Sequence, residues 1–459
     1  MSFPATPPIA PAKQDWRFPA VRRLRLGNGL RVCLLPQRQL PMIRLRLMIP
    51  GGRRLEAFGV APGTTALTMR CSRYGTENYA AADLALAMDA LGTSIQSLSG
   101  LDALAYSMQC TSEAFAKSME LFGELLLRPV FPSSELEREA AKLAASKRQS
   151  ASSPSANSGL WMSRLLYEGH PYGVPSSSPE EVLAVPARDL QEYHHRHVRP
   201  HGAVLVLVGD FETARMADFL AKKFGSWTGE APVVEPPSPA RGPKGKKMLF
   251  LERPGALQSQ VLLGAKAIDR SHPDHLGMQL INHIFGGGAS SRLFKDLREK
   301  RSLTYGCSSS LDSGAWGGDL VAGLSCSSVH TVEAVEALLD QFKMICTTAV
   351  EESELEACKR YKLGTWPAAS ARIRGMANLV MAQAIHGLPE DTWQRYPDRV
   401  DAMHRDRLFA MAQEHLSSGD IAVVVVGSAE AYSALSQSYE AIQRKAMDAR
   451  PERGVVVGD

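Results

Sequence analysis

The stretch DLQEYHHRHVRPHGAVLVLVGD (Asp189–Asp210) has the pattern of a helix, a loop and a buried apolar strand that ends in Val-Gly. A second stretch, DRLFAMAQEHLSSGDIAVVVVGS (Asp406–Ser428), follows the same plan. Its terminal glycine, Gly427, lies 218 residues after Gly209, the glycine that ends the first strand. Two units of this size are too few for a solenoid, so the repeat predicts a duplicated domain.

The start of each half supports the duplication. LRVCLLP (Leu30–Pro36) is followed by a second strand, MIRLRLMI, and KMLFLERP (Lys247–Pro254) is followed by QVLLGAK in the same way. Between the halves, TGEAPVVEPPSPARGPKG (Thr228–Gly245) contains five prolines and no periodicity, which is typical of a semi-extended linker. The sequence therefore predicts an N-terminal arm (1–21), a first domain (22–227), a linker (228–246), a second domain (247–450) and a tail (451–459).

Hairpins and helices alternate along the chain. LALAMDALGTSIQSL (Leu84–Leu98) begins as a helix and continues as a strand, and ALAYSMQC (Ala103–Cys110) pairs with that strand through a short turn. Ser133 and Ser134 are expected to cap ELEREAAKLAASKRQS, a charged and solvated helix. Strands in hairpins with helices grouped apart predict α+β domains with mainly antiparallel sheets.

The composition narrows the class of protein. The 459 residues carry a net charge of +4, which is too small to argue for nucleic-acid binding. No apolar run reaches the ~18 residues that a membrane helix needs, and the Pro-rich N-terminus has no apolar stretch like that of a secretory signal. Seven scattered cysteines without a CxxC pair fit free thiols in a reducing compartment. We therefore expect a cytoplasmic protein that binds neither nucleic acid nor membrane.

Short motifs of known chemistry give no complete site. The glycines at 286–288 are not followed by the lysine of a phosphate-binding loop, and no serine-hydrolase elbow occurs. His197 and His201 have a spacing that suits a metal, but Pro200 between them is expected to end the helix first. His272 and His275 flank a proline and are expected at a turn and at a helix start.

The segment FGGGASSRLFKDLREKRSLTYGCSSSL (Phe285–Leu311) carries a specific resemblance. It is similar to the C-terminal homologous domain of the pitrilysin/insulinase-like zinc peptidases, the inverzincins. LGNGLRV, DALGTSIQSLSGLDALAYSM, RPVFPSSELERE and RPHGAVLVLVGDF match the family in order and spacing, so the resemblance covers about Arg22 to Leu435. It implies two homologous domains, each with an antiparallel sheet packed by helices.

The first half departs from the family at its zinc site. Active members carry His-x-x-Glu-His on a helix, where the two histidines hold zinc and the glutamate activates the bound water. Ala66 and Arg70 stand at the two histidine positions, and Met69 stands at the glutamate position. The chain has no histidine before His170. The third-ligand position is filled by one of three small residues, Ala144, Ala145 or Ser146. The resemblance therefore implies no metal on this chain, and Glu139, which matches an accessory carboxylate, is expected on a solvated helix face.

The resemblance also implies a pair of chains. Some family members are heterodimers in which one chain carries zinc and the other supplies an arginine and a tyrosine to a shared chamber. Arg298 and Tyr305 match that pair with the family's spacing, and Tyr305 is expected to open a strand. A guanidinium and a tyrosine hydroxyl can stabilise the oxyanion of amide hydrolysis or hold substrate carbonyls. This predicts a non-catalytic subunit, inactive alone, whose homologous partner binds zinc.

The expected substrate is a short or unfolded peptide that adds a strand to a sheet edge inside the chamber. A natural-product precursor peptide is one candidate, and small peptides that are degraded in bulk are another. Two other functions stay open on the sequence: a structural or assembly subunit without a part in cleavage, and a peptide-binding module that acts alone. An independent hydrolase finds no support, since the sequence shows no pairing of a nucleophile with a base.

Overall fold

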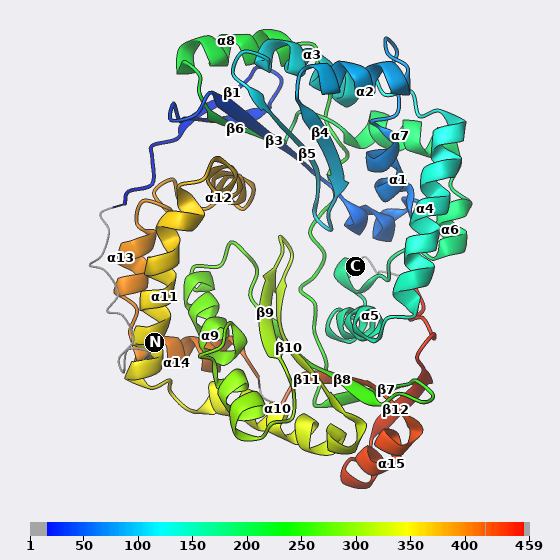
Figure 1. Cartoon of the computed structure of the whole chain (residues 1–459), viewed down its shortest axis with the longest axis vertical. Helices are drawn as coiled ribbons and strands as arrows, with labels where there is room; N and C mark the ends of the chain where they lie inside the picture. The colour runs from blue at the N-terminus through cyan, green and yellow to red at the C-terminus, as the bar shows by residue number, and fades with distance from the viewer. Residues whose placement is uncertain (1–15, 418, 454–459) are drawn as a thin grey trace, which may run out of the picture.

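The computed structural model describes residues 16–417 and 419–453. Two halves face each other, and each is built on one six-stranded sheet with helices on its outer face (Figure 1). The first half lies at the top of the view and the second at the bottom. The structure therefore confirms the predicted α+β class and the duplication.

The first sheet has the strand order β1 (Arg22–Arg25), β2 (Arg31–Pro36), β6 (Val204–Gly209), β3 (Met42–Pro50), β5 (Ala103–Thr111) and β4 (Ser94–Ser99). Strands β2 and β6 pair in parallel, and the other neighbours are antiparallel. Every residue of β6 is buried because the strand is central and covered on both faces. Strand β3 instead alternates between buried and half-buried residues, so its two faces meet different surroundings.

The second sheet repeats this order with β12 (Ile442–Ala446), β7 (Lys247–Glu252), β11 (Ile421–Gly427), β8 (Gln258–Ala267), β10 (Gly318–Ser327) and β9 (Cys307–Ser313). Strands β7, β11 and β12 run parallel, and the remaining pairs are antiparallel. The sheets differ at one edge, where β1 precedes β2 along the chain but β12 comes from the end of the chain. Both sheets are mixed and mainly antiparallel.

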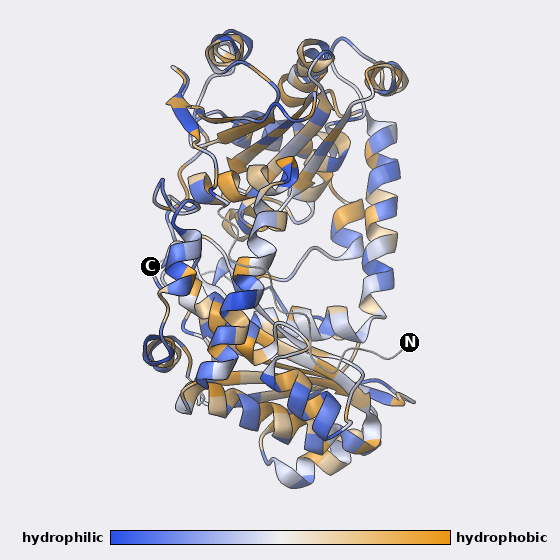
Figure 2. Ribbon diagram, turned by 60° about the vertical axis from the view of Figure 1, so that its left-hand side comes forward, coloured by the Kyte–Doolittle hydropathy of each residue, from blue (hydrophilic) through white to orange (hydrophobic). Residues whose placement is uncertain are grey.

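Helices cover the outer faces of the sheets. Above the first sheet lie α2 (Ala81–Ala90), α3 (Phe115–Leu127) and α8 (Thr213–Phe224), whose apolar side chains join the strands in one core. The second sheet is covered in the same way by α9 (His275–Gly286), α10 (Thr331–Thr347), α14 (Arg405–His415) and α15 (Ala429–Ser438). Figure 2 shows the resulting pattern, with apolar strands inside and mixed polar and apolar helices outside.

One helix of each half packs on the sheet of the other half. Helix α5 (Pro154–Leu166) belongs to the first half in sequence, yet its Trp161 and Met162 pack on β7 and β11 of the second sheet. Helix α12 (Ile373–Ile385) is exchanged in the opposite direction, and its Val380 and Met381 pack on β2 and β6. Each half therefore needs the other to bury the inner face of its sheet.

A polar contact also joins the halves at the turn between β9 and β10. The Tyr172 hydroxyl donates to Asp102 at 2.7 Å and accepts from the backbone N–H of Trp316 at 3.0 Å. The backbone N–H of Ala315 donates to Asp102 at 3.0 Å, and the guanidinium of Arg54 lies 3.8 Å from the centre of the Trp316 ring. The turn of the second half is thus fixed by side chains of the first.

The remaining elements connect these layers. They are α1 (Thr64–Cys71), α4 (Ser133–Ala151), α6 (Pro179–Leu183), α7 (Ala187–His197), α11 (Glu352–Ser370) and α13 (Tyr396–Asp401), with the short helical segments η1 (Arg53–Phe58), η2 (Pro171–Gly173), η3 (Phe294–Lys300) and η4 (Ser328–His330). No helix or strand lies between Phe224 and Lys247, the stretch expected to be a linker.

Among the described residues, none of the helices is long and apolar enough to cross a membrane.

The predicted N-terminal arm lies mostly outside the described residues, as do residues 454–459 of the predicted tail. The last residues of the arm pack on the second half. Phe18 is buried beside Trp366, and the Trp16 indole donates to the Ser370 hydroxyl at 2.6 Å. The Pro-rich composition gave no sign of these contacts, because one or two aromatic residues suffice to anchor an otherwise irregular segment.

Candidate functional site

Helix α1 places the positions at which the family carries its zinc motif. The helix begins after Gly63, whose left-handed backbone and N–H contact with Glu56 at 3.0 Å fix its start. Ala66 and Arg70 lie one turn apart and are both half-buried. Met69 is 1% exposed and packs in the apolar core of the first half. The position of the general base therefore holds an apolar side chain that points away from the site.

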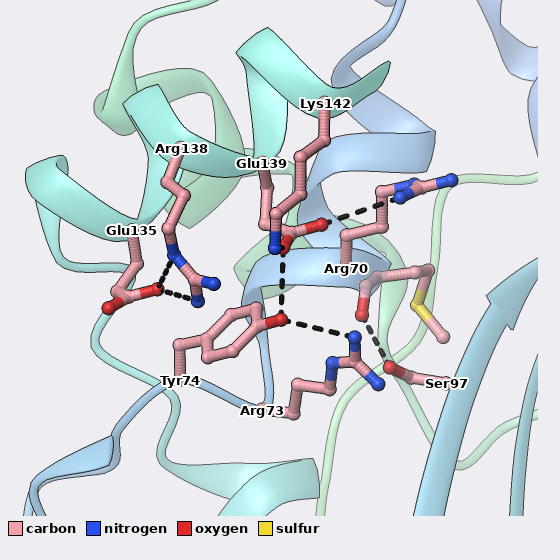
Figure 3. A network of polar contacts seen from close by, with 9 residues as sticks. Arg70, Arg73, Tyr74, Ser97, Glu135, Arg138, Glu139 and Lys142 are labelled. Carbon is pink, nitrogen blue, oxygen red and sulfur yellow. Dashed lines mark hydrogen bonds and ion pairs between the residues drawn. The ribbon is translucent and has the colours of Figure 1, made fainter. Parts of the chain in front are cut away.

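Helix α4 brings a carboxylate to Arg70. Glu139 is only 2% exposed and contacts three side chains: Arg70 at 3.4 Å, Tyr74 at 2.9 Å and Lys142 at 3.0 Å (Figure 3). Burial alone would raise the pKa of Glu139, but the hydrogen bonds from Lys142, Tyr74 and Arg70 outweigh it and hold the pKa below its ordinary value. The expectation of a solvated face was wrong for Glu139.

Further cations surround this pair. Arg73 donates to the Tyr74 hydroxyl at 3.1 Å, and the Arg138 guanidinium lies 4.7 Å from the centre of the Tyr74 ring while it pairs with Glu135 (Figure 3). The predicted serine caps of α4 are also wrong, since Pro132 occupies the N-cap and both serines lie within the first turn. Four cations thus lie around two carboxylates, and the cluster has a net positive charge.

These residues do not fit a zinc ion. Ala66 and Met69 offer no nitrogen or oxygen ligand, and the Arg70 guanidinium brings its own positive charge to the carboxylate that is left. At the third-ligand position, Ala144 is buried while Ala145 and Ser146 are exposed. In the ion pair between Arg70 and Glu139, the guanidinium neutralises the carboxylate, so that no metal ion is needed to neutralise it.

The predicted arginine and tyrosine lie in the other half of the chain. Arg298 is exposed on η3, a π-helical segment, with its guanidinium 4.6 Å from the centre of the Phe294 ring. Tyr305 is 94% exposed and lies two residues before β9, so it does not open that strand as expected. Within the described residues neither side chain forms a hydrogen bond or an ion pair. The structure leaves both groups accessible from outside the chain.

Comparison with protein families assigns each half a known domain type. Residues 32–165 match the model described as insulinase (peptidase family M16), and residues 184–362 match the peptidase M16 inactive domain. The chain belongs to the M16 peptidase family. The second match includes Arg298 and Tyr305, while the first includes Ala66, Met69 and Arg70, the positions that the sequence resemblance aligns with the zinc motif.

Relatives share this M16 organisation over most of their length. An uncharacterized zinc protease of Mycobacterium leprae is 26% identical over 354 residues, which are 76% of this chain and 78% of the relative. An uncharacterized zinc protease of Bacillus subtilis is 23% identical over 62% of this chain and 68% of its own length. A solved M16 inactive domain from Pseudomonas fluorescens superposes with a TM-score of 0.84 at 23% identity, covering 89% of this chain and 98% of that structure.

Two histidines and an aspartate of this M16 chain form a cluster that the sequence did not predict. His272, Asp274 and His415 place their ligand atoms within 4.8 Å of one another, although the last comes from a different helix. Asp274 already accepts from Arg407 at 2.6 Å and from His415 at 3.0 Å, so its carboxylate is neutralised by protein groups. The predicted turn and helix start are confirmed, since α9 begins at His275.

The tract around His197 ends as predicted. Helix α7 stops at His197, before Pro200, so His201 lies beyond the helix. His197 itself is buried with its ring 4.8 Å from that of Tyr193, and burial lowers its pKa to about 4. A neutral, buried ring serves as a packing residue and not as a metal ligand at the end of the helix.

Proposed function

We propose that this chain is the non-catalytic subunit of a heterodimeric M16 zinc peptidase. The observation that carries the proposal is the ion pair between Arg70 and Glu139, which fills the place of the metal on α1 and α4. A chain of this family that hydrolyses peptides by zinc chemistry therefore needs a homologous partner that holds the zinc. The zinc proteases among its relatives give the class of that partner.

Arg298 and Tyr305 are the groups that this chain would supply to the shared site. Both are exposed, and neither forms a hydrogen bond or an ion pair among the described residues. A π-helix is rare and is found often at functional sites, which fits a segment whose geometry serves more than packing. An arginine and a tyrosine hydroxyl next to a scissile carbonyl would donate hydrogen bonds to the oxyanion that develops there.

The proposed substrate is a short or unfolded peptide. Strands β4 and β9 each have one unpaired edge in the order of their sheets, and an extended peptide can add a strand to such an edge. Folded proteins do not offer a free extended segment, so a requirement for strand addition selects unstructured peptides. A natural-product precursor remains one candidate of this kind.

Localisation in the cytoplasm is part of the proposal. The seven cysteines are free thiols, and six of them are buried. Buried unpaired thiols are the usual state in a reducing compartment. Peptidase assays on separated cell fractions test this proposal. Finding the active complex outside the cytoplasm would contradict it.

The test uses the complex of this chain with a zinc-motif M16 homologue from the same genome. Arg298→Ala and Tyr305→Phe are each expected to lower kcat/KM by roughly 10²–10³, the effect of removing one oxyanion donor. Lys300→Ala is the matched control, because it removes a positive charge from the same exposed segment. Wild-type rates in both variants, with the complex intact, would favour a structural subunit instead.

A further inference from the structure

Three arginines gather on the inner face of the first sheet. In β3, alternate residues such as Ile43 and Leu45 point into the core under α3 and α8. Arg44 and Arg46 lie between them and point to the opposite face, on the side where α12 packs (Figure 1). Arg374, exposed on the first turn of α12, completes the group, since its charge acts on both Arg44 and Arg46. We call Arg44, Arg46 and Arg374 the arginine triad.

The triad has no counter-charge. Within residues 16–417 and 419–453, none of its members forms an ion pair with a carboxylate. Arg44 donates to the Gln109 amide oxygen at 3.0 Å, and Arg46 donates to the Asn378 amide oxygen. The Nε of Arg44 is buried and has no acceptor. These neutral partners take some of the hydrogen bonds of the triad but none of its charge.

The environment makes this charge costly. Burial lowers the pKa of Arg44, and the charges of Arg374 and Arg46 lower it further. Burial and the charge of Arg374 likewise lower the pKa of Arg46. Arg44 and Arg46 are partly desolvated and Arg374 is exposed. Cations that repel one another favour the approach of an anion, which would relieve the repulsion.

The second sheet shows that the fold does not require these arginines. Arg44 pairs with Val208 one residue before Gly209 on β6, and Gln260 pairs with Val426 one residue before Gly427 on β11. In the same register, Arg46 corresponds to Leu262. The duplicated strand thus carries an amide and an apolar side chain where the first carries two cations.

A polar cavity is lined by one member of the triad, Arg44. Its volume is about 280 Å³, and its lining contains no carboxylate: Met42, Arg44, Gly92, Ser94, Gln96, Ser107, Met108 and Gln109. The hydroxyl and amide groups of this lining can donate hydrogen bonds to carboxylate oxygens. Two lining residues, Ser94 and Gln96, belong to the edge strand β4, along which the proposed peptide would pair.

We propose that the arginine triad and this cavity bind an acidic side chain of the peptide substrate, so that the chain selects peptides rich in Asp or Glu. Guanidinium groups recognise carboxylates through paired, charge-assisted hydrogen bonds. Because β3 belongs to the first half and α12 to the second, the binding site exists only when the exchanged helix is in place. The inference rests on the proposed function, since it assumes that a peptide enters between the halves.

Titration calorimetry on the full chain tests it. The probes are an unstructured, C-terminally amidated peptide with two Glu residues, the same peptide with two Gln, and the Gln peptide with a free C-terminus. The Glu peptide is expected to bind at least tenfold more tightly than the amidated Gln peptide, and its affinity is expected to fall with added salt. A fourth probe, a single-stranded oligonucleotide of the same charge, is expected to bind more weakly than the Glu peptide.

Variants assign the effect to the triad. Arg44→Gln and Arg46→Leu copy the second sheet, and each is expected to weaken binding of the Glu peptide roughly tenfold. Arg22→Gln removes one exposed charge from the far edge strand of the same sheet and is expected to leave binding unchanged. Thermal unfolding of each variant, with a midpoint no lower than that of the wild type, confirms that the fold is intact.

The outcomes separate the two proposals. Equal binding of the Glu and Gln peptides would overturn the acidic-peptide inference and leave the subunit proposal standing. Tighter binding of the Gln peptide with a free C-terminus, without tighter binding of the Glu peptide, would also overturn it. The triad would then bind the terminal carboxylate and not an acidic side chain. Tighter binding of the oligonucleotide would overturn it in favour of a nucleic acid. Binding of no peptide at all would contradict the subunit proposal as well.

Discussion

Two clusters of charge in the first half differ in how their charges are compensated. Between α1 and α4, the buried carboxylate of Glu139 is contacted by Arg70, Tyr74 and Lys142. In the arginine triad on the inner sheet face, cations lie close together without a carboxylate. Because buried charge is stable only when it is paired, the first cluster supports the fold. The arginine triad is half-buried or exposed, and its unpaired charge suits the anionic ligand that we propose. On this account, the positions aligned with the zinc motif have a structural role, and the proposed binding chemistry lies in the arginine triad.

Removal of the Glu139 carboxylate should have the largest effect on the comparison between the two clusters. Glu139→Gln keeps the shape of the side chain but loses three charge-assisted contacts, so we expect a loss of about 2 kcal/mol in the free energy of unfolding. The midpoint of urea unfolding measures it. Glu137→Gln, on the exposed face of the same helix, is the control and should change little. An equal effect of both substitutions would mean that the Glu139 cluster does not support the fold.

Acid should erase the difference between wild type and Glu139→Gln. The pKa of Glu139 is lower in the folded chain than its ordinary value of 4.5. Its contribution to stability is therefore complete above that value and is lost as pH falls through the folded pKa. Unfolding midpoints measured from pH 7 to pH 3 should converge at the acid end. A constant gap across this range would show that the carboxylate charge is not what stabilises the cluster.

The tyrosine of the cluster gives a smaller effect. Tyr74→Phe removes one hydroxyl donor to Glu139 while Arg70 and Lys142 stay, so we expect a loss of about 1 kcal/mol. Tyr79→Phe is the control, since Tyr79 is half-buried nearby and no hydrogen bond of its hydroxyl is seen. The same unfolding measurement on both variants shows whether the hydroxyl or the ring matters.

The triad should give the smallest loss of stability. Arg44→Gln relieves repulsion from Arg46 and Arg374, so the free energy of unfolding should stay within about 0.5 kcal/mol of the wild type or rise. A loss in the free energy of unfolding as large as that of Glu139→Gln would contradict the distinction between the two clusters. The comparison would then reduce to two structural networks.

Much of the fold could be predicted from local pattern. The strands at Leu30–Pro36 and Lys247–Pro254, the repeated Val-Gly strand ends and the hairpin before Cys110 all appear in the structure within a few residues. The exchange of α5 and α12 could not be predicted. An apolar helix face shows that a helix is covered but does not show which sheet covers it.

For the site between α1 and α4, the sequence predicted only the absence of zinc ligands. The missing histidines at Ala66 and Arg70 are visible in the sequence, but the burial of Glu139 is not. Its neighbour Lys142, three residues on, gives the pattern of a solvated helix, whereas its contacts with Arg70 and Tyr74 cross 69 and 65 residues of chain. The π-helix around Arg298 and the approach of Arg374 to β3 likewise depend on tertiary packing.

The most direct test of the central claim is a cleavage titration. An unstructured peptide is incubated with this chain alone, with the zinc-motif homologue alone, and with mixtures of increasing molar ratio. The account predicts no cleavage by this chain, little by the homologue, and a rate that saturates at one chain of each kind and is abolished by a zinc chelator. Cleavage by this chain alone that survives the chelator, or a homologue that is fully active alone, would contradict it.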